Sequence, residues 1–223
     1  MIDASAPLNP ATLPPLPALI VAWGRGWAVS RGVAEPVEVP GGFRADVGRH
    51  GHRVRYVLHT WDTDLIADLS RQVTEPGTWI KVSGRATDLR GALPARWIMD
   101  SAAYLMSAPF AVGAGVPPAS YELLVTGDGE AIIATVVDAA GAVAASGRLA
   151  PAGEYGVIDQ VQTAPEHRRQ GLATTVMRAL SDHAARNGLR TGVLVATQDG
   201  RRLYRTLGWT VRSEIAAAYV PES

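Results

Sequence analysis

The segment from Arg168 to Thr174 combines residue types that suit phosphate binding. It reads Arg-Arg-Gln-Gly-Leu-Ala-Thr and follows an apolar stretch that is interrupted at Pro165. If a helix begins here, its N-terminus offers free N–H groups and a positive dipole end, beside which Arg168 and Arg169 add charge. Gly171 would let a ligand approach the backbone closely. The segment therefore predicts a site for a phosphate-bearing ligand.

A strand and a helix must position this turn. The apolar residues from Val157 to Val161 are typical of a buried strand. Beyond Gly171 the period changes, and the pair Asn187-Gly188 is typical of a left-handed helix end. The apolar residues between these points fall on one helical face: Leu172, Ala173, Val176, Met177, Leu180 and Ala184.

Composition narrows the classes of partner. The 223 residues include 21 basic and 21 acidic groups, and zero net charge argues against a nucleic-acid or anionic-membrane binder. No cysteine is present, which excludes disulfides and thiolate metal sites and fits a cytoplasmic protein. The apolar run Leu16–Ala22 is too short to span a bilayer and lacks signal-peptide flanks. His50-Gly-His52 shows no recognised metal-ligand spacing, so we expect no metal.

The chain predicts two halves with a shared order of strand, helix, strand, short helix, strand, strand. We expect an N-terminal α/β domain at residues 1–112, a linker at 113–119 and a second domain at 120–223. The similarity suggests a diverged duplication. Where the second half has the basic turn, the first has Thr60-Trp-Asp-Thr-Asp64. Its two acids would repel a pyrophosphate, and it has no glycine to let one approach the backbone.

Periodicity and turn residues place the elements of each half. In the first half we expect helices at Leu16–Arg31, Thr63–Val73 and Thr87–Leu93, and strands at Phe43–Val47, Val54–His59, Thr78–Val82, Trp97–Met99 and Ala103–Met106. In the second we expect, besides the opening strand and helix, a short helix at Gly200–Leu207 and strands at Tyr121–Val125, Ala131–Val137, Ala142–Ser146, Gly192–Thr197, Trp209–Ser213 and Ile215–Val220. Trp23 and Trp27 favour core packing over a pocket.

Two motifs resemble one enzyme family. Arg168 to Ala173 fits the Arg/Gln-x-x-Gly-x-Gly/Ala signature of the GNAT superfamily of N-acetyltransferases. Tyr204-Arg-Thr-Leu-Gly208-Trp209 resembles the family's second signature, Tyr-x-x-x-Gly-aromatic. Because both occur in the family's order of elements, the resemblance is specific. It implies an α/β fold with a mixed, mostly antiparallel sheet that splays at the cofactor site, here preceded by a smaller related α/β domain.

The resemblance implies acetyl transfer from acetyl-CoA to an amine of a small molecule or a protein. In the matching positions, pantetheine would bind at Val161, Gln162 and Thr163, and the oxyanion would meet a strand N–H near Val161. Tyr204 would contact the cofactor and, as general acid, protonate the departing thiolate. The pyrophosphate would be held at Arg168, Arg169, Gln170, Gly171, Leu172, Ala173 and Thr174.

The base is open at this stage. Asp159 lies nine residues before Arg168, where several family members carry a catalytic glutamate, and a carboxylate there could accept the amine proton. Asp159 could equally face solvent or pair with an arginine. Glu154 is a second candidate, and an ordered water would make either carboxylate unnecessary.

One departure from the family affects the acceptor site. The family has two helices between its first two strands, whereas here Tyr121–Val125 passes to Ala131–Val137 through a tight turn. Either the first domain or a partner subunit of a homodimer would then cover the acceptor site. The same departure motivates an alternative function, a non-catalytic CoA-sensing or scaffold protein on a degenerate acetyltransferase fold.

Overall fold

The computed structural model describes residues 14–128 and 130–222. Its helices are α1 (Leu16–Arg31), α2 (Thr63–Gln72), α3 (Ala86–Ala92), α4 (Leu172–Arg186) and α5 (Gln198–Thr206), with a 3-10 turn, η2, at Pro165–His167. Its strands are β1 (Val37–Val39), β2 (Gly42–Arg49), β3 (His52–Leu58), β4 (Thr78–Ser83), β5 (Ile98–Met99), β6 (Ala103–Pro109), β7 (Tyr121–Asp128), β8 (Ala131–Asp138), β9 (Val143–Ala152), β10 (Tyr155–Thr163), β11 (Thr191–Ala196) and β12 (Thr210–Tyr219).

These strands form one mixed sheet in the order β1-β2-β3-β4-β12-β6-β11-β10-β9-β8-β7, with β5 pairing to β12 outside this path. Only the β3–β4 and β10–β11 pairs are parallel, and the others are antiparallel. The predicted fold class, a mostly antiparallel α/β sheet, is therefore confirmed.

The two halves exchange their last strands at the middle of the sheet. β12 leaves the second half and pairs with β4 of the first, and β6 of the first half pairs with β11 of the second. Outward from the central β12–β6 pair, the order β12-β4-β3-β2 on one side matches β6-β11-β10-β9 on the other. This agrees with the predicted duplication. The division at residues 113–119 stays a prediction.

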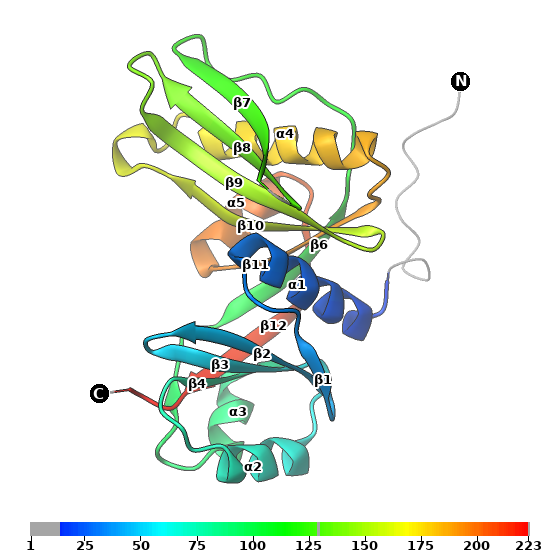
Figure 1. Ribbon diagram of the computed structural model, residues 1–223, viewed down its shortest axis with the longest axis vertical. Coiled ribbons are helices and arrows are strands. Elements are labelled where there is room, and N and C mark those ends of the chain that lie inside the picture. The colour runs from blue at the N-terminus through cyan, green and yellow to red at the C-terminus, as the bar shows by residue number, and fades with distance from the viewer. Residues whose placement is uncertain (1–13, 129, 223) are drawn as a thin grey trace.

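Helix α1 lies between the two halves and covers the face of the sheet opposite α4 (Figure 1). It contacts β9, β10 and β11 of the second half and β2 of the first. Gly26 allows this approach, because a Cβ built there would lie 2.4 Å from a methyl carbon of Val157. Trp23 and Trp27 are 6% exposed and pack into the shared core, as expected. Between β7 and β8 the described residues form no helix.

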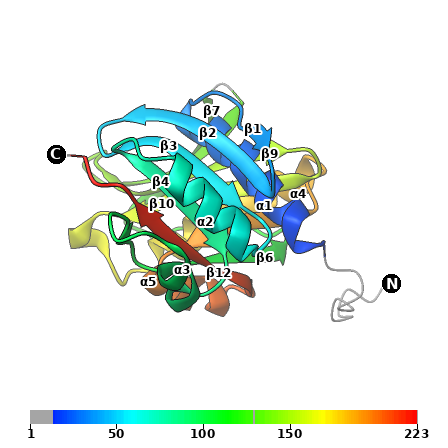
Figure 2. The ribbon, with the colours of Figure 1, turned by 90° about the horizontal axis from the view of Figure 1, so that it is seen from below.

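The other helices cover separate cores. α4 packs on β8, β9 and β10, and α5 packs on β11, β12 and β6. α2 and α3 cover the strands of the first half (Figure 2), where Ile66, Leu89 and Trp97 are almost fully buried. Asp62 caps α2 by accepting a hydrogen bond from the Leu65 N–H at 3.0 Å.

The C-terminal strand differs from its prediction. The sequence predicted two strands, Trp209–Ser213 and Ile215–Val220, because polar residues interrupt the apolar pattern between them. The structure has one strand, β12, with a register shift between Val211 and Ser213. The Ser213 hydroxyl lies 2.6 Å from that of Ser83, so a partner on a neighbouring strand satisfies the polar interruption.

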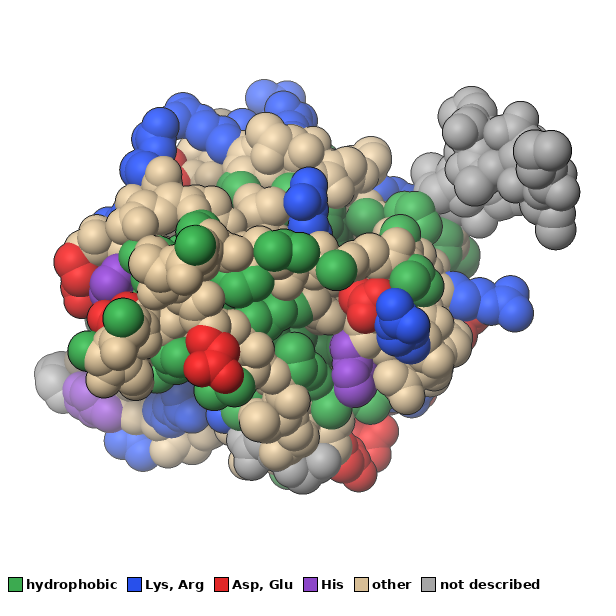
Figure 3. Space-filling model, turned by 90° about the horizontal axis from the view of Figure 1, so that it is seen from above, with side chains coloured by type: hydrophobic (Ala, Val, Ile, Leu, Met, Phe, Trp, Pro, Cys, Tyr) green, Lys and Arg blue, Asp and Glu red, His purple; other side chains and the backbone are tan. Residues whose placement is uncertain are grey.

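The end of the molecule formed by β7 and α4 exposes hydrophobic side chains, which gather in the middle of the face seen in Figure 3. β7 is an edge strand of the sheet, and Leu124 and Val125 on it are 41% and 42% exposed. Among the described helices, none is long and apolar enough to cross a membrane.

Candidate functional site

β10 and β11 separate after a short paired stretch. They pair in parallel only from Tyr155 to Val157, whereas the corresponding β3 and β4 pair from Val54 to Leu58. A β-bulge in β10 between Asp159 and Gln162 accompanies the separation. A bulge leaves one residue out of the ladder and bends its strand. The result is a cleft of about 1150 Å³ between the two strands, closed by the N-terminus of α4 and by α5.

The N-terminus of α4 faces this cleft. Gly171 precedes the helix with φ +79°, a left-handed conformation that favours glycine, and it makes no side-chain cap. Arg169 also has a positive φ, +64°. The uncapped first turn leaves backbone N–H groups available to an anion, and the helix dipole adds positive potential. Arg168 and Arg169 line the cleft beside it.

The structure brings the predicted cofactor residues together, with one exception. Gln170 does not line the cleft, and its side-chain oxygen accepts a hydrogen bond from the Tyr121 hydroxyl at 2.9 Å. The residues that do line it are Val161, Gln162, Thr163, Arg168, Arg169, Gly171, Leu172, Ala173, Thr174 and Tyr204.

Tyr204 closes the other side of the cleft from α5. It is 9% exposed, its ring lies 6.3 Å from that of Trp209, and its hydroxyl makes no hydrogen bond to any other described residue. Burial, and secondly the charge of Asp159, raises the pKa of Tyr204 to about 12. The phenol is therefore protonated throughout the physiological range.

Asp159 is held by the C-terminal end of α1. Its carboxylate accepts two hydrogen bonds from Arg31, at 2.5 and 3.0 Å, and one from the Ser30 hydroxyl at 3.1 Å. The pairing with an arginine, one of the two roles that the sequence left open, is therefore present. A carboxylate engaged in this way is less available to a substrate amine. Glu154 is exposed in the β9–β10 turn, at the end of β10 away from the bulge.

Several residues of the cleft were not predicted. His167, Asp199 and Arg202 line it, and the Nδ1 atom of His167 lies 2.9 Å from the Tyr121 hydroxyl. His167 directly precedes Arg168 in the basic turn, so its position in the sequence could have predicted that it lines the cleft. No sequence signal links Arg31 to Asp159, because 128 residues separate them.

The same cleft could hold a long ligand with an anionic end. Its α4 end offers helix N–H groups and arginines, and its middle offers the backbone of a bulged strand. Tyr204 supplies a protonated donor at the α5 side. No group of three or more metal-ligating side chains is found among the residues described.

A protein-family model matches the part of the chain that contains the cleft. Residues 103–209, which include β6, match the model of the acetyltransferase (GNAT) family. No curated protein matches the chain.

Solved structures share the fold over nearly the whole chain. A GCN5-related N-acetyltransferase from Kribbella flavida superposes with a TM-score of 0.67 at 15% identity, covering 92% of this chain and 96% of that one. Another, from Sphaerobacter thermophilus, gives 0.61 at 14% identity and covers 94% and 95%. A tandem GNAT protein from the clavulanic acid biosynthesis pathway gives 0.51 at 16% identity and covers 70% and 68%.

Proposed function

We propose that this chain, which carries a GNAT-family acetyltransferase domain at residues 103–209, transfers an acetyl group from acetyl-CoA to a primary amine of a small molecule or a protein. The observation that carries the proposal is the cleft between the separated β10 and β11, with an uncapped helix N-terminus at one end and Tyr204 at the other.

The cleft offers a chemical match to each part of acetyl-CoA. The pyrophosphate would bind the first-turn N–H groups of α4 with Arg168 and Arg169, since anions are favoured at helix N-termini. The pantetheine amides would pair with the backbone from Val161 to Thr163, which β11 leaves open. The N–H groups around the bulge would stabilise the oxyanion that forms on the thioester carbonyl.

Tyr204 would act on the departing sulphur. The amine nitrogen forms the new C–N bond, the C–S bond breaks, and one N–H proton ends on sulphur. With a pKa of about 12, Tyr204 stays protonated at neutral pH and can donate as charge develops on the thiolate. Because a thiol has a pKa of about 8.5, complete transfer of the Tyr204 proton to sulphur is uphill. It becomes possible when the proton lost by the amine replaces the one that Tyr204 donates.

The amine proton needs an acceptor. Asp159 remains a candidate, since it lies on β10 at the bulge, but its ion pair with Arg31 would first have to loosen. A water in the cleft would serve without that change. We therefore expect Asp159→Asn to impair turnover less than Tyr204→Phe.

Thiol release tests the proposal directly. The chain has no cysteine, so a thiol reagent in an assay with acetyl-CoA and a panel of amines detects only released CoA. We expect wild-type protein to release thiol above the rate without amine. Tyr204→Phe should lower kcat by about 10²-fold or more, the range for a lost general acid, with little change in acetyl-CoA affinity. A variant with wild-type kcat would refute the role of Tyr204.

The alternative is a non-catalytic CoA-binding protein on the same fold. It predicts acetyl-CoA binding with no amine-dependent thiol release from any member of the panel. Tyr204 weighs against it, since binding alone does not require a buried phenol beside the cleft. Amine-dependent release that is lost in Tyr204→Phe would exclude it.

A further inference from the structure

A second hollow adjoins the cofactor cleft. This hollow, called the basic groove below, has a volume of about 750 Å³ and lies between the C-terminal end of α1 and strands β9 and β10. Gln160 lines both the groove and the cleft, and its side-chain amide donates to the carbonyl oxygen of Ser30 at 3.3 Å. With φ +55°, Gln160 has the left-handed backbone of the bulge. The groove therefore opens beside the strand segment where the thioester would lie.

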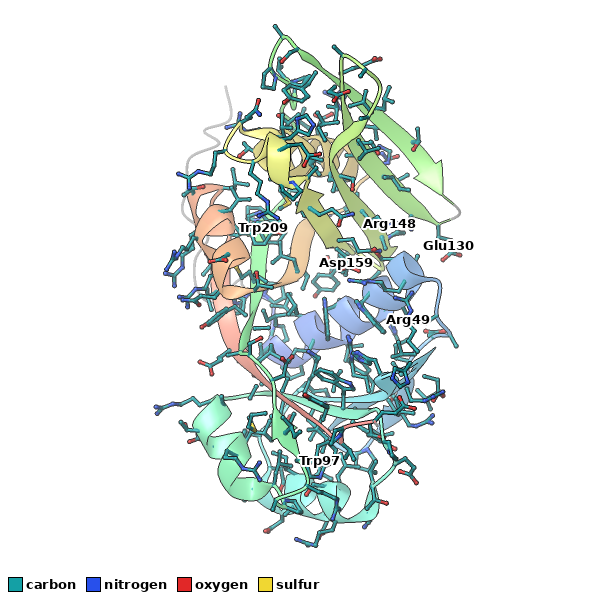
Figure 4. All side chains as sticks on the ribbon, turned by 90° about the vertical axis from the view of Figure 1, so that its left-hand side faces the viewer. Arg49, Trp97, Glu130, Arg148, Asp159 and Trp209 are labelled. Carbon is teal, nitrogen blue, oxygen red and sulfur yellow. The ribbon has the colours of Figure 1, made fainter. Side chains whose placement is uncertain are left out.

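Arginines dominate the charged lining of the groove. Figure 4 shows Arg49, Arg148 and Asp159 gathered around the end of α1, with Glu130 farther out. Four arginines face two glutamates, so positive charge is in excess. The charged residues that line the groove are Arg25, Arg31, Arg49, Arg148, Glu35 and Glu130.

The arginines differ in their partners. Arg31 pairs with Asp159, and Arg25 lies 3.6 Å from Glu35. The side chain of Arg49 makes no hydrogen bond or ion pair with any other described residue. It lines both the basic groove and a smaller cavity of about 100 Å³ behind it.

A buried arginine stands in that smaller cavity. Arg55 is only 8% exposed, and its side chain contacts the Nε2 atom of His52, at 2.9 Å, and the rings of Trp27 and Trp23, at 4.1 and 5.9 Å. None of these is a carboxylate. Burial, and then the charge of Arg31, lowers the pKa of Arg55 to about 10, and the charge of Asp159 offsets only part of that decrease. Buried charge is costly unless it is compensated, so this region favours an anion at its mouth.

We propose that the basic groove is the acceptor site and that the acceptor is an amine with a carboxylate or phosphate group, which Arg49 binds. The inference rests on the acetyl transfer proposed above and names the substrate class for it. An arginine guanidinium binds either anion through two parallel hydrogen bonds. With its anionic end anchored in the groove, the acceptor can extend its amine past Gln160 into the cleft. This anchoring orients the amine for attack on the thioester.

Matched acceptors test this assignment. The panel consists of short ω-amino carboxylates, their uncharged amides and the corresponding ω-amino phosphonates, each assayed by thiol release with acetyl-CoA. We expect kcat/KM to be higher for one or both anionic series than for the amides by about tenfold or more, the size expected for a charge-assisted hydrogen bond. The two anionic series show whether carboxylate or phosphate is preferred.

Variants on one strand locate the effect. Arg49→Gln should reduce the ratio of kcat/KM for the anionic amine over its amide by about tenfold. Arg44→Gln is the matched control, since Arg44 lies on the same strand, pairs with Asp46 at 2.7 Å and does not line the groove. It should keep the wild-type ratio.

Binding separates this inference from the proposed transfer. An ω-amino carboxylate should raise the unfolding temperature of wild-type protein with CoA bound, and Arg49→Gln should remove that rise. If Arg49→Gln removes this rise but no amine gives thiol release, the groove assignment stands and the proposed acetyl transfer is refuted. If the uncharged amides react as well as the anionic amines, or if Arg49→Gln leaves the ratio of their kcat/KM values unchanged, the groove assignment is wrong while the transfer stands.

Discussion

Replacing Gly26 by alanine tests whether α1 packs on the second half as described. In an exposed helix interior, this change stabilises a protein by about 1 kcal/mol, because glycine is a poor helix former. At Gly26 the added Cβ would lie 2.4 Å from Cγ2 and 2.5 Å from Cβ of Val157, and 3.2 Å from the carbonyl oxygen of Ala150. Val157 is fully buried on β10, so it cannot move aside without disturbing the core.

The two effects have opposite signs, and their sizes predict the outcome. Overpacking a core by one methyl group costs about 1–3 kcal/mol, against the gain of about 1 kcal/mol from helix propensity. We expect Gly26→Ala to lower the free energy of unfolding by up to about 2 kcal/mol. For a chain of this size, that corresponds to a fall of several degrees in the unfolding temperature.

Urea denaturation of matched variants measures this difference. Gly91→Ala is the control, because Gly91 lies in α3 and a Cβ there meets nothing within 4 Å. Gly91→Ala should gain up to about 1 kcal/mol. The displaced α1 of Gly26→Ala should also weaken the contact of Arg31 with Asp159. A Gly26→Ala protein as stable as Gly91→Ala would refute the packing of α1 against β10.

Two further predictions concern charge and assembly. Burial, and then the charges of Arg55 and other nearby cations, lowers the pKa of His52 from 6.5 to about 3, so folded protein keeps it neutral where the unfolded chain binds a proton. The free energy of unfolding should therefore fall as pH drops from 6.5 toward 3, by at most about 1.4 kcal/mol per pH unit and by less for a half-exposed ring. His52→Gln should flatten this dependence on pH. Equal slopes for the wild-type protein and the variant would contradict the prediction. Residues 113–223 made alone lack α1 and β6, so they should aggregate unless co-expressed with residues 1–112. A cooperative folded monomer would contradict the strand exchange.

Local patterns predicted the elements of the site well. Helix α1 begins and ends at the predicted residues, and α4 begins directly after Gly171, because apolar periodicity and turn residues act within a few positions of each other. The basic turn and Tyr204 were placed by motifs that depend on the same short range. Each of these signals is contained in one segment of the chain.

Long-range pairing could not be predicted in the same way. Any apolar strand could have paired with β11, and nothing in the sequence of β6 distinguishes it from β12 as the partner. The contact of Arg31 with Asp159 depends on how α1 packs, which Gly26 decides. The basic groove likewise collects residues from the first and second halves, so it exists only in the assembled sheet.

The most direct test of the central claim is the unfolding temperature measured with and without acetyl-CoA. At 100 times its dissociation constant, a ligand stabilises by about 2.7 kcal/mol, so we expect a rise of about 5–10 °C. Gly171→Glu places a carboxylate at the proposed pyrophosphate site and should abolish the rise. Gly188→Glu, at the other end of α4, has a similar positive φ (+80° against +79°) and open space, and should keep it. No rise in wild-type protein, or an undiminished rise in Gly171→Glu, would contradict the assignment of the cleft.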